Sequence, residues 1–143
     1  MAYKGQRTEV EIPNEIEGYP VTRIEAFAFM DNNTLENLIL PQSVKCIGTE
    51  CFWNVSSLKS ITIPKSVISI GRNAFYNSIR EVVFEDGITK IPDYACYGAT
   101  NLENIILPES VTYIGASAFH GCEKINGQLI LDGNIESIGE HAF

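Results

Sequence analysis

Basic residues and histidine are scarce in this sequence, and each shortage excludes a class of function. The chain has 10 Lys and Arg against 18 Asp and Glu in 143 residues, so its net charge is −8. General affinity for nucleic acid needs clustered lysine and arginine, so we expect no nucleic-acid partner. The two histidines, His120 and His141, stand in no spacing that is typical of a metal site or a nucleophile–base pair.

Long apolar runs and the common catalytic motifs are also missing. No stretch approaches the roughly 18 consecutive apolar residues that cross a bilayer, and residues 1–9 carry no apolar stretch of a secretion signal. The sequence contains no Gly-x-Gly-x-x-Gly, no Gly-x-Ser-x-Gly, no phosphate-binding loop and no calcium-binding loop. We therefore predict a protein that is not an enzyme, holds no metal or cofactor and inserts no segment into a membrane.

One motif recurs along nearly the whole chain. The isoleucine that ends each copy stands at Ile24, Ile47, Ile70, Ile91, Ile114 and Ile138. Subtraction gives steps of 23, 23, 21, 23 and 24 residues. A fixed period of about 20 to 29 residues is typical of a solenoid in which each copy adds one coil. The sequence thus predicts an N-terminal tail, 1–9, and one solenoid, 10–143. Because the chain stops inside a copy at Phe143, we expect a fragment of a longer array.

Each copy has the same internal order of short elements. Two apolar residues with one residue between them predict a short strand, which pairs in parallel with the strand of the next copy at about 4.8 Å. A second extended segment, a glycine and a helical turn carrying one large ring complete the coil. The strand residues expected to face inward are Leu38, Leu40, Ile61, Ile63, Val82, Phe84, Ile105, Leu107, Leu129 and Leu131.

Two parts of the array depart from this order. The copy at 79–96 has Glu85 where other copies have proline, and Cys96 where they have phenylalanine, so we expect it to pack most loosely. In the first copy, residues 14–20 widen a turn that includes Gly18-Tyr19-Pro20, and we expect this turn to cover part of the end of the solenoid.

Four cysteines, Cys46, Cys51, Cys96 and Cys122, are compatible with disulfides by number alone. However, Cys51 and Cys96 stand at repeat positions that hold Ala74 and Phe75 in the next or preceding copy. No Cys-x-x-Cys spacing suggests a metal site. Core packing explains these positions, so we predict free thiols.

The repeats resemble the BspA-like, or treponemal-type, leucine-rich repeats of bacterial and protist surface proteins. The motif is L-x-x-I-x-I-P-x-S-V-x-x-I-G-x-x-A-F, with near-complete copies starting at Leu35, Leu58 and Leu102. Pro41, Pro64 and Pro108 follow the strand, where repeats of the ribonuclease-inhibitor type carry an asparagine ladder. The resemblance implies a right-handed, non-catalytic solenoid at the cell surface or outside the cell, used for adhesion or host-protein contact. It implies no site residues, since the shared positions are core positions.

Two aligned rows of side chains are the candidate binding surfaces. The outer ridge consists of the central strand residues Ile39, Thr62, Val83, Ile106 and Ile130. Contiguous exposed apolar surface marks interfaces, although β-propensity alone also favours such residues on an exposed strand. The aromatic row consists of Met30, Trp53, Tyr76, Tyr97 and His120. Its rings are candidates for holding a sugar or a protein loop, or for stacking on one another.

These features favour a protein- or glycan-binding module of a bacterial surface or secreted protein. One alternative is a structural spacer for another domain. Another is a cytoplasmic interaction or inhibitor protein. We also predict self-association through the uncapped C-terminal coil, at Ile135, Ile138 and Phe143, because repeat proteins normally need a polar terminal cap.

Overall fold

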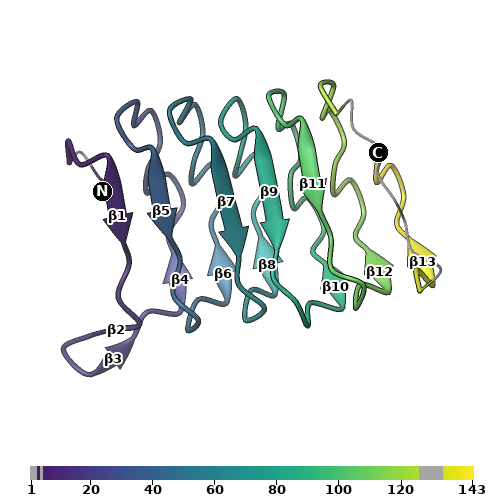
Figure 1. The fold of residues 1–143 in the computed structure, drawn as a ribbon, viewed down its shortest axis with the longest axis horizontal. Coiled ribbons are helices and arrows are strands. Elements are labelled where there is room, and N and C mark those ends of the chain that lie inside the picture. Colours follow the sequence, from purple (N-terminus) through teal and green to yellow (C-terminus); the bar gives the residue numbers. More distant parts are fainter. Residues whose placement is uncertain (1–2, 4, 126–133) are drawn as a thin grey trace.

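The computed structural model describes residues 3, 5–125 and 134–143, which form a stack of short parallel strands (Figure 1). The first strand row contains β1 (Glu9–Glu11), β5 (Asn37–Ile39), β7 (Ser60–Ile63), β9 (Glu81–Phe84) and β11 (Asn104–Ile106). The second strand row contains β4 (Arg23–Ile24), β6 (Cys46–Ile47), β8 (Ser69–Ile70), β10 (Lys90–Ile91), β12 (Tyr113–Ile114) and β13 (Ser137–Ile138). A hairpin of β2 (Glu15–Ile16) and β3 (Tyr19–Pro20) is antiparallel.

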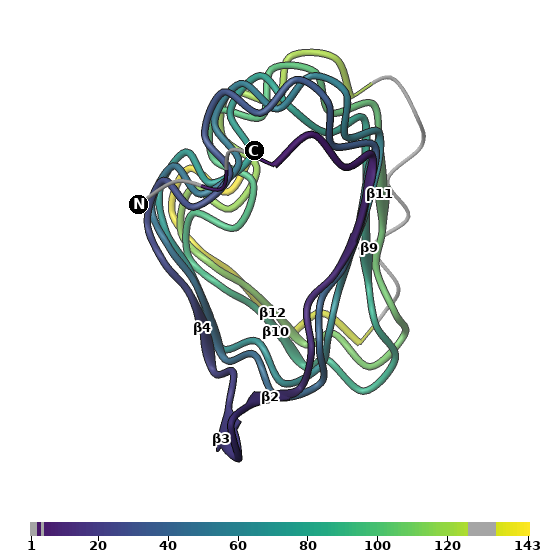
Figure 2. The ribbon, with the colours of Figure 1, turned by 90° about the vertical axis from the view of Figure 1, so that its left-hand side faces the viewer.

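The coils wind in a right-handed sense. We number them by residues as coil 1 (9–34), coil 2 (35–57), coil 3 (58–78), coil 4 (79–101), coil 5 (102–124) and coil 6, which starts at 125. Figure 2 looks along the stack and shows the two strand rows as opposite walls, joined by a third wall of loops. The chain descends the first row and ascends the second while it advances toward the C-terminus (Figures 1 and 2).

The predicted inward register is confirmed over the described strands. Leu38 and Leu40 are 8% and 7% exposed, and the corresponding residues of β7 and β9 are 0–2% exposed. Ile105 and Leu107 are only half-buried. Leu129 and Leu131 lie outside the described residues. Ile39, between two inward residues, is 60% exposed, as strand alternation requires.

The expected helical turns do not form in the described residues, where stacked turns without a helix stand instead. Each loop places residues in the left-handed region, such as Glu50 at φ 53° and Asn54 at φ 58°. A left-handed residue interrupts the right-handed helix, so the backbone N–H groups find other acceptors. The Phe52 N–H donates to the Ala74 carbonyl at 2.8 Å, and the Asn54 N–H to the Tyr76 carbonyl at 2.8 Å. In the described residues, the loops therefore form a third ladder that joins successive coils except coils 3 and 4.

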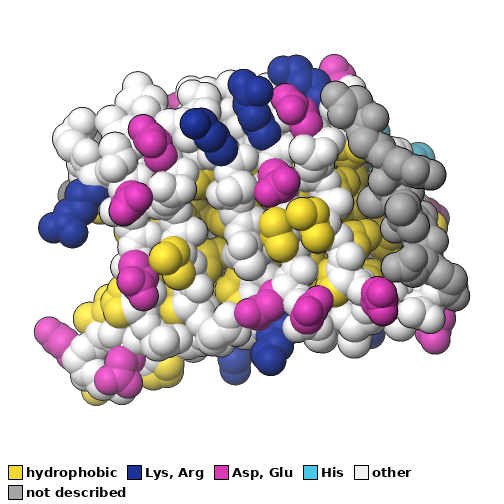
Figure 3. Space-filling model, in the orientation of Figure 1, with side chains coloured by type: hydrophobic (Ala, Val, Ile, Leu, Met, Phe, Trp, Pro, Cys, Tyr) yellow, Lys and Arg dark blue, Asp and Glu magenta, His cyan; other side chains and the backbone are white. Residues whose placement is uncertain are grey.

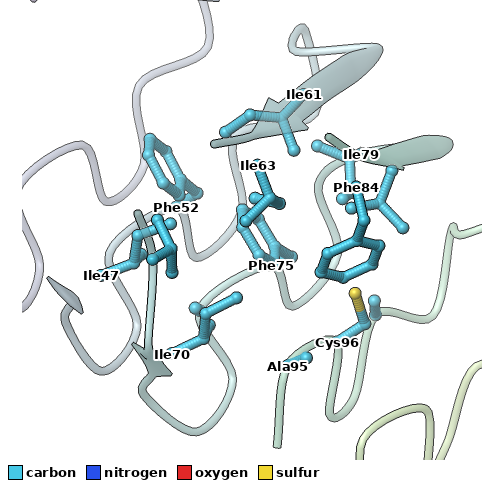
Figure 4. Close-up of a cluster of buried hydrophobic side chains, with 14 of the residues drawn as sticks. Ile47, Phe52, Ile61, Ile63, Ile70, Phe75, Ile79, Phe84, Ala95 and Cys96 are labelled. Atoms are coloured by element: carbon cyan, nitrogen blue, oxygen red, sulfur yellow. The ribbon is translucent and has the colours of Figure 1, made fainter. Parts of the chain in front are cut away.

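A column of phenylalanine rings fills the core. Phe29, Phe52 and Phe75 stack with centroids 5.3 and 5.4 Å apart. Cys96 interrupts this column in coil 4, but the ring of Phe84 points toward Cys96 from β9 (Figure 4). Both residues are at most 2% exposed. Coil 4, which we predicted to pack most loosely, is thus as buried as its neighbours, because one strand residue supplies the ring that the loop lacks.

The widened turn of coil 1 does not cover the end of the solenoid. The β2–β3 hairpin projects away from the body (Figures 1 and 2), and its Ile16 and Tyr19 are 59% and 77% exposed. The Tyr3 ring instead lies on Phe29 with centroids 5.5 Å apart. The buried Asn32 amide donates to the Gly5 carbonyl at 3.4 Å. Residues of the N-terminal tail therefore contact the exposed face of coil 1.

Among the described strands, each row is interrupted at one place. In the first row, β7, β9 and β11 form one ladder and β1 and β5 another. In the second row, β4, β6 and β8 form one ladder and β10, β12 and β13 another. The β5–β7 break and the β8–β10 break lie on opposite walls of the solenoid (Figure 2).

Candidate functional site

The structure places part of the outer ridge as one continuous strip. Thr62, Val83 and Ile106 are direct register partners across β7, β9 and β11. Thr62 is exposed, Val83 is half-buried and Ile106 is 49% exposed. Ile39 is more exposed, but the β5–β7 break separates it from Thr62. Ile130, the fifth predicted member, lies outside the described residues.

A groove with a volume of about 510 Å³ lies beside the ridge. Residues of β1, β5 and β7, all in the first strand row, line this β5–β7 groove. Glu9 and Glu11 lie at one side, and Ile39 and Thr62 contribute apolar and hydroxyl surface. Figure 3 shows exposed hydrophobic side chains in the middle of this face, acidic side chains at its left and lower edges, and Lys and Arg side chains along its upper edge. The apolar middle and the acidic edges suit a partner with an apolar segment and basic residues beside it.

In the aromatic row, the rings of two pairs of residues cover one another. Trp53 and Tyr76 stack with centroids 4.1 Å apart and planes 14° from parallel. Tyr97 stacks on His120 at 5.4 Å, and the Arg72 guanidinium lies 4.7 Å from the Tyr97 centroid. Ring faces that contact neighbours are not open platforms for a sugar. The stacking interpretation of this row therefore explains the geometry better than a sugar-binding one.

A polar ladder that the sequence analysis missed runs beside the aromatic row. Asn54 donates to Asp31 at 2.9 Å, Asn77 to Asn54 at 2.8 Å and Asn101 to Asn77 at 2.8 Å, all through side chains. Lys124 continues the ladder with a 2.9 Å bond to Asn101. The signal was available, since Asp31, Asn54 and Asn77 each follow a member of the aromatic row directly.

All four cysteines are unpaired in the structure. Burial raises the pKa values of the Cys51 and Cys96 thiols, and it raises the pKa of Cys122 to about 12. The Cys122 thiol donates to the Cys96 carbonyl at 3.1 Å. These thiols remain protonated near neutral pH and are poor nucleophiles, which fits packing roles.

Within residues 3, 5–125 and 134–143, no three His, Cys, Asp or Glu side chains cluster in a way that would hold a metal ion. In the same part of the chain, no helix has the length and hydrophobicity to span a membrane.

Comparison with protein-family models gives one match. The model described as the BspA type leucine rich repeat region matches residues 21–143 in six copies. Among curated proteins, no match was found.

Comparison with solved structures identifies several leucine-rich-repeat proteins of bacteria. A leucine rich cell surface protein of Faecalibacterium prausnitzii is 24% identical with a TM-score of 0.54, over 87% of this chain and 48% of that one. A leucine-rich repeat protein of Eubacterium ventriosum is 22% identical with a TM-score of 0.67, over 96% and 42%. One of Bacteroides ovatus is 23% identical with a TM-score of 0.51, over 82% and 35%. The chain thus spans less than half of each, and at these identities the likeness shows the fold.

Proposed function

Because the chain belongs to the BspA-type leucine-rich-repeat family, we propose that it is a protein-binding module of a bacterial cell-surface protein and binds through the outer ridge. The observation that carries the proposal is the exposure of Ile39 and Ile106, at 60% and 49%, on a wall where alternate residues are buried. Large exposed side chains of this kind contribute to binding when a partner covers them.

The surroundings of the ridge support a protein as the partner. The β5–β7 groove, with its backbone and acidic groups, lies beside Ile39. An apolar side chain of a partner can therefore enter the groove next to the exposed Ile39 side chain. The aromatic row offers few open ring faces, which disfavours a glycan that must stack on them. The surface location rests on the described role of the Faecalibacterium prausnitzii protein, of which this chain spans 48%.

The test compares charged variants on two exposed sites of similar character. Ile39→Asp with Ile106→Asp places two charges on the ridge, and Tyr19→Asp places one on the β2–β3 hairpin, where Tyr19 is also exposed. We expect the ridge variant to lose at least tenfold in binding to host-cell surface protein in a pull-down with quantitative mass spectrometry, with melting temperature unchanged. Glycan arrays serve as the second arm.

Three outcomes contradict the proposal. If the ridge variant captures the same proteins as the parent, the ridge is not the binding face, and a spacer role is favoured. If the Tyr19 variant loses as much, binding lies at the hairpin. If only the glycan array gives saturable binding, the partner is a glycan.

The C-terminal coil supports a separate proposal of self-association. Ile138 and Phe143 are 47% and 52% exposed, and the Phe143 ring covers Phe119 with only one of its faces, at 5.6 Å. We expect sedimentation velocity to show dimers that disappear when a polar capping coil is fused after Phe143. Dimers that persist in the capped protein would show that association occurs elsewhere.

A further inference from the structure

We propose that the break between β8 and β10 is a second binding site, on the wall opposite the ridge, that takes one extended polypeptide segment of a partner protein as an inserted parallel strand. This site is independent of the outer ridge and of the function proposed above. The argument rests on the width of the break, on its free backbone groups and on its lining.

The break is wider than a normal strand spacing. Paired strands lie about 4.8 Å apart, so a gap that holds one additional strand measures about 9.6 Å. No Cα atom of β8 lies within 8 Å of one of β10. Figure 1 shows β8 and β10 farther apart than any neighbouring strands of the second row on either side, while β7 and β9 stay adjacent on the opposite wall. Coils 3 and 4 are therefore farther apart at the second strand row than at the first.

The cause lies in one residue of coil 4. Gly48, Gly71, Gly115 and Gly139 share one position in their coils, and each packs against backbone of the preceding coil; a Cβ at Gly115 would lie 2.5 Å from the Asp93 nitrogen. Coil 4 has Pro92 at this position. A proline adds atoms where the backbones meet and removes the N–H that would bond to coil 3. Close approach of the two coils is therefore prevented on this wall.

The break leaves a complementary set of free backbone groups. At the next junction, Thr112 and Tyr113 donate to the Thr89 carbonyl, and Gly115 donates to Ile91. The equivalent donors of coil 4 are Thr89 and Lys90, and within the described residues neither N–H has a bonding partner. The equivalent acceptors are the carbonyls of Ile68 and Ile70, which receive no such bond from the described part of coil 4. The β8 side of the break thus offers hydrogen-bond acceptors and the β10 side offers donors, as a parallel strand requires on its two sides.

The lining indicates which segment fits. The groove has a volume of about 510 Å³, and its inner part is apolar, with Val67, Ile88 and Ile91. Lys65 and Lys90 line its outer part, while the Asp93 carboxylate is engaged by the Ala116 N–H at 2.8 Å. An occupant with inward apolar residues and an outward acidic residue is complementary to this lining. The 75% exposed Ile68 stands at the edge, where it would contact the occupant.

A peptide with the sequence of residues 134–140, Asn-Ile-Glu-Ser-Ile-Gly-Glu, is a suitable probe. It reproduces a second-row strand of the repeat and carries Glu136 at the position of Ile68 and Thr89. In the inserted register, its second and fifth residues face the apolar lining. The N–H groups of its serine and glycine meet the carbonyls of Ile68 and Ile70.

The experiment is an NMR titration of the whole chain with this peptide, blocked at both ends. We expect saturable binding with amide shift changes confined to residues 68–71 and 89–91, and slowed exchange of the Thr89 and Lys90 amides. A peptide N-methylated at its serine and glycine should bind at least tenfold more weakly, because it lacks both donors. Lys65→Glu with Lys90→Glu should weaken binding at least tenfold. The matched control, Lys59→Glu, changes an exposed lysine on the opposite wall and should have no effect.

Each contrary result overturns the proposal. It is wrong if no shift appears at millimolar peptide, if the shifts map to the ridge, or if the N-methylated or scrambled peptide binds equally well. It is also wrong if Thr89 and Lys90 amides are already protected like Tyr113 in the free protein. If the chain dimerises and the peptide disperses the dimer, a second copy is the occupant and a foreign segment is not.

Discussion

The junction of coils 3 and 4 differs from that of coils 4 and 5 in how the backbones are joined. Coil 5 is bonded to coil 4 through all three walls: the β9–β11 ladder, the Gly115 N–H to the Ile91 carbonyl at 2.9 Å in the second row, and the Gly98 N–H to the His120 carbonyl at 2.8 Å in the loops. Between coils 3 and 4, the described residues keep only the β7–β9 ladder. The loop donors equivalent to Gly98 find no acceptor in coil 4 among these residues.

Side chains hold the open junction together instead. The Asn101 amide donates to Asn77 at 2.8 Å, and the Arg72 guanidinium lies 5.0 and 4.7 Å from the ring centroids of Tyr94 and Tyr97. The apolar core remains continuous, because Phe84 replaces the ring absent at Cys96. The difference teaches that burial and backbone pairing are specified separately, because the core stays buried across a junction at which the backbone ladder of the second row is broken.

The largest expected effect comes from removing a core ring. It shows whether the core is as continuous at the open junction of coils 3 and 4 as at a closed junction. Phe75→Ala and Phe52→Ala should each lower the free energy of unfolding by about 3–5 kcal/mol, because each leaves a ring-sized cavity. Chemical denaturation provides the values, with Lys65→Ala as an exposed control. If Phe75→Ala costs no more than Lys65→Ala, the core is not continuous across the open junction.

The next prediction compares the shared glycine position in closed and open junctions. Gly115→Ala should destabilise by about 1–3 kcal/mol, since the added Cβ overlaps the backbone of coil 4. Pro92→Ala at the open junction should cost about 1 kcal/mol or less, chiefly through the freedom that the unfolded chain gains. If urea titrations give equal losses of unfolding free energy for the two variants, steric overlap is not the cause of the opening.

Thiol alkylation should distinguish the two junctions in the native state. Cys51 and Cys96 are both fully buried, and burial raises their pKa values, so only opened molecules provide thiolate. We expect Cys96 to react about tenfold faster than Cys51, because coil 4 separates from coil 3 more easily.

The pH dependence of this reaction has a definite sign. Both rates should rise with pH up to the pKa of an exposed thiol, about 8.5, since the reactive species is the opened thiolate, and their ratio should stay constant. Mass spectrometry after timed quenching gives both rates. A faster reaction at Cys51 would show that the coil 3–4 junction is not the weaker one.

The smallest effect is a coupling between the two exchanged core positions. Phe84→Leu and Cys96→Phe should each destabilise, the first by leaving space and the second by overpacking. Together they restore the order of the other coils. The double variant should therefore lose about 1 kcal/mol less unfolding free energy than the two single variants lose in sum. Strict additivity would show that Phe84 does not fill the space beside Cys96.

Much of the fold was predictable from the sequence, and the candidate surfaces were predictable in part. The spacing of the isoleucines and the alternation around Leu38 and Leu40 gave the coil length and the inward register. The prediction of a helical turn was wrong because left-handed residues such as Glu50 and Phe27, at φ 53° and 61°, carry no clear sequence signature. The close burial of coil 4 was not predicted, because the ring of Phe84 that fills the space beside Cys96 lies twelve residues earlier in the chain.

The sequence by itself determined the solenoid, its period and the residues that face inward, since burial of one apolar set per coil is a local and repeated property. The tertiary structure alone decided which surfaces are available. Whether Trp53 and Tyr76 present faces or cover each other, and whether Thr89 and Lys90 find acceptors, depends on the distance between coils. That distance is set by contacts between residues more than twenty positions apart, such as the one that Pro92 prevents.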